Sequence, residues 1–234
     1  MIVSVHQPAY LSWLGYFHKI ALADVFVFLD DTQFEKNSFV NRNRIKTAQG
    51  PIWLTVPVKL GGHIDKKISE IEIADKVWQR KHWQSIELNY KKSAYWQEYS
   101  AELKNFYEKD FSHIADLCFA QLQWFVKLLG LSTKIIKASD LKLDNFKKQD
   151  LILAICRELK ADIYVSGQQG KNYITLEKFQ ANGVKVYFQD YHHPKYSQLW
   201  AGFEPFMGII DLFLNEGPKS LEIILKNNLT KNLL

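Results

Sequence analysis

Two histidines and two aspartates carry the side chains best suited to proton transfer. His6 follows the first apolar segment of the chain, Asp30 and Asp31 follow the second, and His193 follows the last. Histidine changes protonation near neutral pH, so His6 or His193, the latter oriented by Asp190, can act as a general base. Neighbouring carboxylates raise one another's pKa or hold a divalent cation. These four residues are therefore the predicted catalytic groups.

Arg42 and Arg44 lie two positions apart in a chain that has only four arginines and draws most of its positive charge from lysine. A guanidinium binds phosphate or carboxylate through two parallel N–H groups, which an ammonium cannot do. The pair therefore favours an anion clamp over a solvated surface. Four further polar residues of the same segment complete the predicted binding set, namely Gln33, Lys36, Asn41 and Asn43.

Polar loops also follow three other predicted strands. The glycines at 167 and 170 allow a ligand to approach the backbone closely. A polar loop packed by tyrosines is the structural alternative for residues 189–196. The paired histidines of that segment lack a cysteine or histidine at zinc-ligand spacing, so no zinc site is predicted there. The substrate-binding residues predicted in these loops are Gln7, Tyr10, Ser166, Gly167, Lys171, Tyr173, Asp190 and Tyr196.

Alternating strands and helices must position these loops. Strands are predicted at 2–5, 25–29, 52–58, 134–137, 162–165 and 184–188, and helices at 10–23, 78–90, 95–107, 111–129, 149–159, 205–214 and 220–229. This order is typical of an α/β fold with a mostly parallel sheet covered by helices, Rossmann-like or nucleotidyl-transferase-like. Ligands of such sheets bind at the carboxyl ends of the strands. We expect one domain, 1–234, with a helical cap-like insertion at about 75–130 and a functional loop over 30–50.

The composition excludes several classes of protein. The 234 residues carry 30 Lys plus Arg and 25 Asp plus Glu, a net charge of +5, and 47% are apolar. These values exclude a disordered chain. The longest uninterrupted apolar strand, 25–29, is too short to span a bilayer, and no basic segment precedes an apolar one as in a signal peptide. The positive charge is dispersed, so nucleic acid is an unlikely partner, and a cytoplasmic location is expected.

Some conspicuous residues are predicted to be structural. Cys118 and Cys156 lie in apolar helical patterns and are expected to be buried free thiols. Asp211 lies in an apolar helical segment and needs a hydrogen-bond partner. Four tryptophans are expected in the core or at an interface, namely Trp78, Trp83, Trp96 and Trp124.

Long motifs resemble those of the WbqC-like family. They are His6-Gln-Pro-x-Tyr-Leu-x-Trp-Leu-Gly-Tyr-Phe-x-Lys19, Ala23-Asp-Val-Phe-Val-Phe-Leu-Asp-Asp-x-Gln-Phe34, Asn41-Arg-Asn-Arg-Ile-Lys46, Tyr164-x-Ser-Gly167, Gln189-Asp190, His193-Pro194-x-Tyr196 and Ile210-Asp-Leu-Phe-x-Asn-x-Gly-Pro218. The resemblance covers essentially the whole chain. It departs from the family's Ser-Gly-x-Gly-Gly pattern at Gln169, which argues against a tight backbone cradle for phosphate there.

Membership of that family implies a role among bacterial O-antigen and surface-polysaccharide enzymes. Its members are suspected of adding an acyl or amino-acyl group, glycyl-like in some proposals, to the amine of a nucleotide-linked sugar. The opening strand, turn and helix are also similar to those of pantothenate synthetases, which make an amide through an acyl-adenylate. The His-x-Gly-His signature of that superfamily is absent from this sequence.

Three functional hypotheses follow. The first is an amide-forming transferase acting on a nucleotide-linked amino sugar. The second is an ATP-dependent amide ligase or nucleotidyl transferase on another small substrate, in which Asp30 or Asp31 holds Mg²⁺. The third is a non-catalytic nucleotide- or glycan-binding partner, which predicts an exposed tryptophan face over 78–96. The acyl donor (ATP-activated, a CoA thioester or tRNA-bound) and the oligomeric state stay open at this level.

Overall fold

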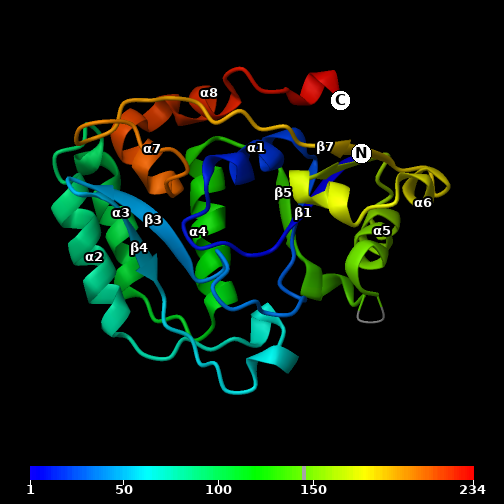
Figure 1. Ribbon diagram of the computed structural model, residues 1–234, viewed down its shortest axis with the longest axis horizontal. Coiled ribbons are helices and arrows are strands. Elements are labelled where there is room, and N and C mark those ends of the chain that lie inside the picture. Colours follow the sequence, from blue (N-terminus) through cyan, green and yellow to red (C-terminus); the bar gives the residue numbers. More distant parts are fainter. Residues whose placement is uncertain (144–145) are drawn as a thin grey trace.

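The computed structural model describes residues 1–143 and 146–234, and its centre is a sheet of five parallel strands (Figure 1). The strands run in the order β5-β2-β1-β6-β7, with every neighbouring pair parallel. This arrangement confirms the predicted α/β class and is Rossmann-like. The strands are β1 (Ile2–His6), β2 (Val25–Phe28), β5 (Lys134–Lys137), β6 (Ile163–Ser166) and β7 (Lys185–Phe188).

Alternate side chains of these strands enter two separate apolar clusters. Val3 and Val27 belong to the cluster on one face of the sheet, and Phe26 and Phe28 belong to the cluster on the other. Both faces are therefore buried, which explains the continuous apolar runs that predicted parallel strands.

Helices cover the two faces. Helices α1 (Leu14–Leu22) and α4 (Ile114–Leu128) pack into the cluster that contains Phe26 and Phe28. Helices α5 (Lys148–Glu158) and α6 (Leu176–Gln180) pack into the cluster that contains Val3 and Val27. The short helix α6 was not predicted, because five residues are too few for a helical period to stand out.

The middle of the chain adds two helices and a hairpin beside the sheet. Helices α2 (Val77–Tyr90) and α3 (Trp96–Glu108) lie next to the antiparallel pair β3 (Arg42–Thr47) and β4 (Gly50–Thr55), at the left of Figure 1. Their buried side chains belong to the same cluster as α1 and α4. Helices α2 and α3 are thus joined to one face of the sheet by a continuous core.

The predicted loop over 30–50 is wrong in its second half, because β3 occupies residues 42–47. Asn43 and Ile45 face the core, whereas Arg42 and Arg44 are half-buried on the other face and Lys46 of that face is buried. Ile45 is the one apolar residue of this strand, so the sequence carried no apolar alternation that would predict it. The two-residue connection 48–49 then pairs β3 with β4, which ends three residues before the predicted strand end.

The predicted start of the first helix is also wrong. Helix α1 begins at Leu14 rather than at residue 10. Leu11 has a left-handed φ of 44°, and the carbonyls of Tyr10 and Leu11 accept hydrogen bonds from the Asn43 amide. Residues 7–13 are therefore held as a turn by a contact that is distant in sequence.

The last predicted helices are shorter than expected. Helix α7 (Ile209–Glu216) starts four residues late, because Phe206 has a left-handed φ of 60° and the Gly208 N–H donates to the Arg44 carbonyl. Helix α8 (Ser220–Leu225) ends four residues early. Short 3₁₀ helices are η1 (His63–Asp65), η2 (Ile68–Glu70), η3 (Ala138–Leu141), η4 (Gln168–Asn172), η5 (Gly217–Lys219) and η6 (Lys231–Leu233).

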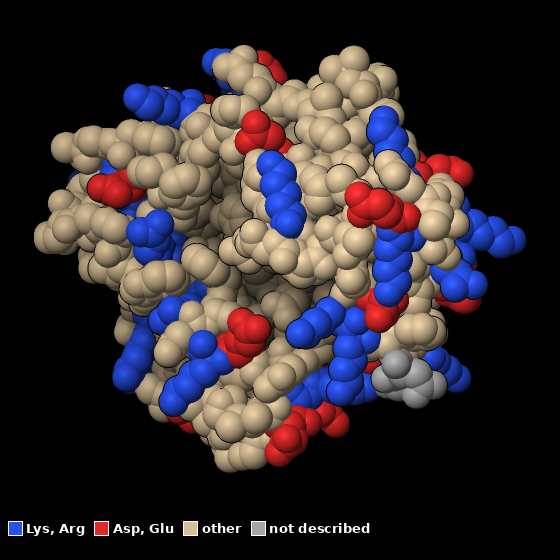
Figure 2. Space-filling model, turned by 45° about the vertical axis from the view of Figure 1, so that its right-hand side comes forward, with Lys and Arg blue, Asp and Glu red and all other residues tan. Residues whose placement is uncertain are grey.

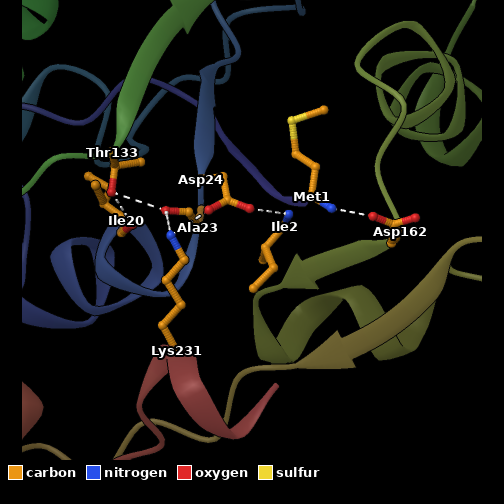
Figure 3. Close-up of polar contacts among 8 residues, drawn as sticks. All are labelled: Met1, Ile2, Ile20, Ala23, Asp24, Thr133, Asp162 and Lys231. Carbon is orange, nitrogen blue, oxygen red and sulfur yellow. Dashed lines mark hydrogen bonds and ion pairs between the residues drawn. The ribbon is translucent and has the colours of Figure 1, made fainter.

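The amino end of the sheet is tied down by charged contacts (Figure 3). Asp24 accepts a hydrogen bond of 2.7 Å from the Ile2 N–H and forms an ion pair with Lys231 of the last 3₁₀ helix. The Met1 amino group pairs with Asp162, and the Thr133 hydroxyl donates to the carbonyls of Ile20 and Ala23. The polar loops of interest leave the opposite, carboxyl edge.

Several structural predictions are confirmed within the described residues. Both cysteines are buried free thiols, and burial raises their pKa.

Trp78 and Trp96 are buried, so the exposed tryptophan face predicted for a binding partner is wrong. In the part of the chain that is described, no helix has the length and apolar character needed to cross a membrane.

Candidate functional site

The sheet reverses its direction of winding between β1 and β6. The chain proceeds from β1 outward to β2 and β5, and then returns to β6 on the other side of β1. Such a switch point leaves a crevice beyond the carboxyl ends of the two strands. His6 ends β1 and Ser166 ends β6. The face turned forward in Figure 2 is hollowed near its middle, and basic side chains border the hollow.

His6 is a neutral histidine with one nitrogen open. Its Nδ1 lies 2.9 Å from the Gln7 carbonyl oxygen, which can only accept, so Nδ1 carries the proton and Nε2 carries the lone pair. The rings of Trp13 and Tyr16 contact the His6 ring edge-on, with centroids 5.2 and 4.8 Å from its own. Desolvation by these neighbours, assisted by the charge of Lys19, lowers the pKa of His6 to about 3, against a smaller opposing effect of the Gln7 bond.

Lys19 lies in the core close to His6 and was missed as a site residue. It is 3% exposed, and its Nζ donates to the Val5 carbonyl at 2.8 Å. Burial lowers the pKa of Lys19 to about 7. Burying an ammonium group costs free energy, which is why the pKa of Lys19 falls. Its positive charge in turn lowers the pKa of His6.

The two arginines project from the outer face of the β3–β4 hairpin. Arg44 is paired with Trp53 in the ladder, and Arg42 lies two residues away on the same face. The Arg42 Cζ lies 4.5 Å from the Trp53 ring centroid, and the Arg44 Cζ lies 5.8 Å from it. Among the described residues neither guanidinium has a carboxylate partner, and both Nε atoms are buried without an acceptor. Arg42 donates one bond, from Nη2 to the Asn37 carbonyl.

A row of aromatic rings joins His6 to the arginines. The ring centroids of Trp13 and Phe39 are 5.7 Å apart, and those of Phe39 and Trp53 are 5.8 Å apart. Phe39 and Trp53 are each 46% exposed. Sequence reasoning missed all three residues. For Trp53, the signal was its position opposite the arginines in an alternating hairpin, and this became visible only once the pairing was known.

Several predicted ligand-binding residues of this region are structural instead. Tyr10 is fully buried and hydrogen-bonded to His82 and Tyr107, which lie in the helical region. Asn43 is also fully buried and holds the turn after β1, and Asn41 donates to the Val56 carbonyl. These assignments were wrong because long-range packing turned the side chains inward.

Other residues of the first two loops stay near the surface. Gln7 is half-buried and donates to the Thr32 hydroxyl at 3.1 Å, which joins the loop after β1 to the loop after β2. Gln33 and Lys36 are exposed. Gln7 therefore lies beside His6, as predicted, while the roles of Gln33 and Lys36 stay predictions.

The two aspartates do not form a joint site. The Asp30 carboxylate is buried and accepts from the Ser139 N–H at 3.0 Å and its hydroxyl at 2.8 Å. Asp31 pairs with Lys67 at 2.5 Å. Both carboxylates are thus engaged in fastening loops, and they do not fit a Mg²⁺ ion held between them. Within the described residues, no cluster of three or more metal-ligating side chains occurs.

The loop after β6 is shaped by its own packing. A Cβ at Gly170 would lie 2.0 Å from the Ser166 hydroxyl, so this glycine is required inside the loop rather than by a ligand. Ser166 is buried and donates to the Gly167 carbonyl, which corrects its predicted role in binding. Lys171 and Tyr173 are exposed at this edge of the sheet.

Both ring nitrogens of His193 are engaged in hydrogen bonds. Its Nδ1 faces the Pro194 carbonyl at 2.9 Å, and its Nε2 accepts from the Phe206 N–H at 3.2 Å. Burial lowers the pKa of His193. Asp190 does not orient it, because that carboxylate accepts from the Gln168 amide. Asp190 therefore does not orient His193 in this structure, and the role of His193 as a base stays a prediction.

Asp211 has the partners that its burial required. It is fully buried and accepts from Tyr90 at 2.8 Å, from Tyr196 at 2.7 Å and from Gln198 at 2.7 Å. Burial raises its pKa, although these donors act against the rise. Tyr196 is thus part of a structural network rather than a ligand-binding residue. We call residues 189–208 the strap, because this network fastens that segment against α2 and α7.

Two surface cavities lie away from this crevice. One, of about 320 Å³, is lined by α2 and α3 residues including Arg80 and Trp83, and the other, of about 750 Å³, lies along α5. Their lining contains none of the predicted site residues. The candidate site therefore consists of His6, Gln7, Trp13, Phe39, Arg42, Arg44 and Trp53.

Comparison with known proteins places most of the chain in one family. The sequence model of the WbqC-like protein family matches residues 7–223. A protein of Mycobacterium tuberculosis (strain ATCC 25618 / H37Rv), "Uncharacterized protein Rv1507c", is 36% identical over 220 residues, covering 93% of this chain and 95% of its own length. No solved structure matches the chain.

Proposed function

The chain belongs to the WbqC-like protein family, and from this premise we propose that it is an amide-forming transferase. Its acceptor is the amine of a nucleotide-linked amino sugar, and it transfers an acyl or amino-acyl, glycyl-like, group in the synthesis of bacterial surface polysaccharide in the cytoplasm. The polysaccharide context and the sugar come from the family resemblance. The choice of an enzyme rests on the side chains at the switch point of the sheet.

One observation carries the proposal. A neutral histidine with an open Nε2 is linked through a row of aromatic rings to two arginines that have no carboxylate partner among the described residues. Leaving guanidinium N–H groups buried without acceptors costs stability. A protein tolerates such a cost at sites where a ligand supplies the missing partner. A diphosphate is a ligand of the required charge, and its oxygens match the guanidinium fork.

The reaction requires a group that accepts a proton. As the sugar nitrogen attacks the acyl carbon, a C–N bond forms, the bond to the donor's leaving group breaks, and the nitrogen loses a proton. The His6 Nε2 takes that proton and returns it to the leaving group. The proton on Nδ1 stays with the Gln7 carbonyl and fixes the ring orientation.

The donor is best supported as already activated, such as a CoA thioester. The ligase hypothesis assigned a Mg²⁺ ion to Asp30 or Asp31, and these carboxylates bind Ser139 and Lys67 instead. The proposed mechanism therefore uses no step through that ion.

A non-catalytic nucleotide-binding protein is the second candidate. The exposed rings of Phe39 and Trp53 beside two arginines favour binding whether or not His6 accepts a proton. The two candidates differ in what a change of His6 does.

The test compares binding and turnover in the same variant. Calorimetry and thermal shift measure affinity for UDP- and dTDP-linked amino sugars, and mass spectrometry measures acyl transfer from CoA thioesters. A ligand at 100 times its dissociation constant stabilises the fold by about 2.7 kcal/mol, so binding is readily seen. We expect His6→Gln to keep nucleotide affinity and to lose about a hundredfold in turnover, the lower end of general-base effects.

His192→Gln is the matched control, because His192 is exposed in the strap. Equal turnover in His6→Gln and His192→Gln contradicts the role of His6. Binding without transfer of any acyl group by the unaltered protein supports the second candidate instead.

A further inference from the structure

The outer face of the β3–β4 hairpin has an open part and a covered part. Lys46 points to the same face as the two arginines, but its ammonium donates to the carbonyls of Trp200 and Gly202 in the strap. Trp53, farther along the face, is 46% exposed. The strap thus ends where the exposed aromatic surface begins.

Trp53 presents a flat ring to solvent at this open part. Its exposed fraction is 46%, although Arg42 stands over the ring and Phe39 packs at 47° to it. Nearly half of the Trp53 surface thus stays exposed although Arg42, Arg44 and Phe39 all lie against the ring. The exposed rings of Phe39 and Trp53 are adjacent, and a contiguous exposed apolar surface is typical of a binding site.

The charge next to the ring defines the ligand. Arg42 and Arg44 both lie against Trp53, and their buried Nε groups have no acceptor among the described residues. A planar ring joined to a strongly anionic group satisfies both features, because aromatic rings stack on tryptophan and phosphate oxygens accept from guanidinium. A nucleoside diphosphate has this construction.

We propose that Trp53 and Phe39 form the base-stacking surface of the nucleotide site, with Arg42 and Arg44 holding the diphosphate. This inference rests on the proposed function and deepens it, since it assigns the nucleobase to residues that no other observation links to a ligand. The row of rings then runs from the base at Trp53, past Phe39 and Trp13, to His6. The sugar lies along this row, and its amine reaches the His6 end.

The test measures the affinity of the full-length protein for UDP, dTDP and inorganic pyrophosphate by calorimetry. Stacking predicts that the nucleoside diphosphates bind at least tenfold more tightly than pyrophosphate. Trp53→Ala is expected to remove that advantage and to leave pyrophosphate affinity within twofold. Trp53→Phe, which keeps a flat ring, is expected to recover most of the lost affinity.

Phe146→Ala is the matched control, because Phe146 is 45% exposed and precedes α5, on the opposite face of the sheet. Its affinities are expected to equal those of the unaltered protein. Circular dichroism of each variant establishes that the fold is retained, and Phe39→Ala, with an expected loss of several-fold, provides a second variant should Trp53→Ala unfold.

The outcomes separate this inference from the proposed function. If pyrophosphate and UDP bind equally and Trp53→Ala changes neither, the stacking surface is contradicted while the arginine clamp stands. If neither ligand binds, both proposals are contradicted. If Trp53→Ala weakens a single-stranded oligonucleotide but not UDP or dTDP, the ring serves nucleic acid and the inference is overturned.

Discussion

The hairpin side and the strap side of the molecule use similar residues in opposite ways. On the hairpin side, His6, Arg42 and Arg44 have polar atoms without partners among the described residues. On the strap side, both ring nitrogens of His193 are bonded and Asp211 accepts from three donors, although the Tyr191 hydroxyl is buried without a partner among the described residues. Residue type alone therefore does not distinguish a functional histidine from a structural one.

The difference shows how one fold can place a segment fastened by hydrogen bonds beside a surface whose polar groups are free to bind a ligand. Satisfied polar groups in a buried network fix the position of the strap. Unsatisfied groups on the hairpin keep their hydrogen-bonding capacity for a ligand, at a cost in stability. We expect changes on the strap side to act mainly on unfolding and changes on the hairpin side mainly on binding.

The largest expected effect is on the strap side. Asp211→Asn places an amide against the hydroxyls of Tyr90 and Tyr196 and the amide of Gln198. Leaving buried donors unpaired in this way is expected to lower the free energy of unfolding by about 3 kcal/mol. Urea denaturation followed by tryptophan fluorescence measures it.

Asp190→Asn is the control for that change, because Asp190 is exposed and accepts only from Gln168 among the described residues. Its effect is expected within about 0.5 kcal/mol. Similar losses in both variants would contradict the assignment of Asp211 as the fastening point of the strap.

Acid is expected to destabilise the protein through its neutral histidines. The folded pKa of His6, about 3, lies below the unfolded value of 6.5, so the unfolded chain binds more protons between these values. Stability therefore falls as the pH drops below 6.5, by about 1.4 kcal/mol per unit for this residue and by about 2 kcal/mol at pH 5. His82, whose pKa is lowered to about 4 by burial, contributes in the same direction.

Unfolding curves at pH 7 and pH 5 measure the effect. His6→Gln is expected to reduce the difference between the two curves, and His192→Gln to leave it unchanged. An undiminished difference in His6→Gln would show that His6 is not desolvated in the folded protein.

Binding is expected to separate the two sides further. Arg42→Ala is expected to weaken UDP binding and to lower acyl transfer by more than tenfold, equivalent to about 1.4 kcal/mol, through loss of a charge-assisted bond to phosphate. The protein is expected to stay folded, since among the described residues the Arg42 side chain donates a single hydrogen bond, to the Asn37 carbonyl. Calorimetry and mass spectrometry provide the two readouts.

Arg157→Ala is the matched control for Arg42→Ala, because Arg157 is exposed on α5. Near-normal binding and turnover in a folded Arg42→Ala protein would contradict the clamp, and an equal loss in Arg157→Ala would show that only net charge matters.

The smallest expected effect is on the stability of the hairpin side. Arg44→Gln removes a buried Nε that lacks an acceptor. The free energy of unfolding is therefore expected to stay within about 0.5 kcal/mol of the unaltered protein, or to rise. A loss comparable to that of Asp211→Asn, measured in the same urea titration, would mean that Arg44 has a structural role and would remove the contrast between the two sides.

The sequence by itself determined the parallel sheet and the edge at which the polar loops leave it. The runs at 25–28 and 134–137 are local apolar patterns, and local patterns select the type of an element. His6, Arg42 and Arg44 could be identified because each has a distinctive chemistry at a recognisable place. Trp53 could not, since its importance depends on the strand that it faces.

Only the tertiary structure decided which polar groups are satisfied. Asn43 reaches the Leu11 carbonyl 32 positions away, and Tyr90 reaches Asp211 across 121 positions. Such contacts leave no periodic trace in the sequence, because they depend on how distant segments pack. For the same reason Tyr10 and His193 carried the right chemistry for a site and became engaged in internal hydrogen bonds, whereas the exposed ring of Trp53 was placed beside the two open arginines.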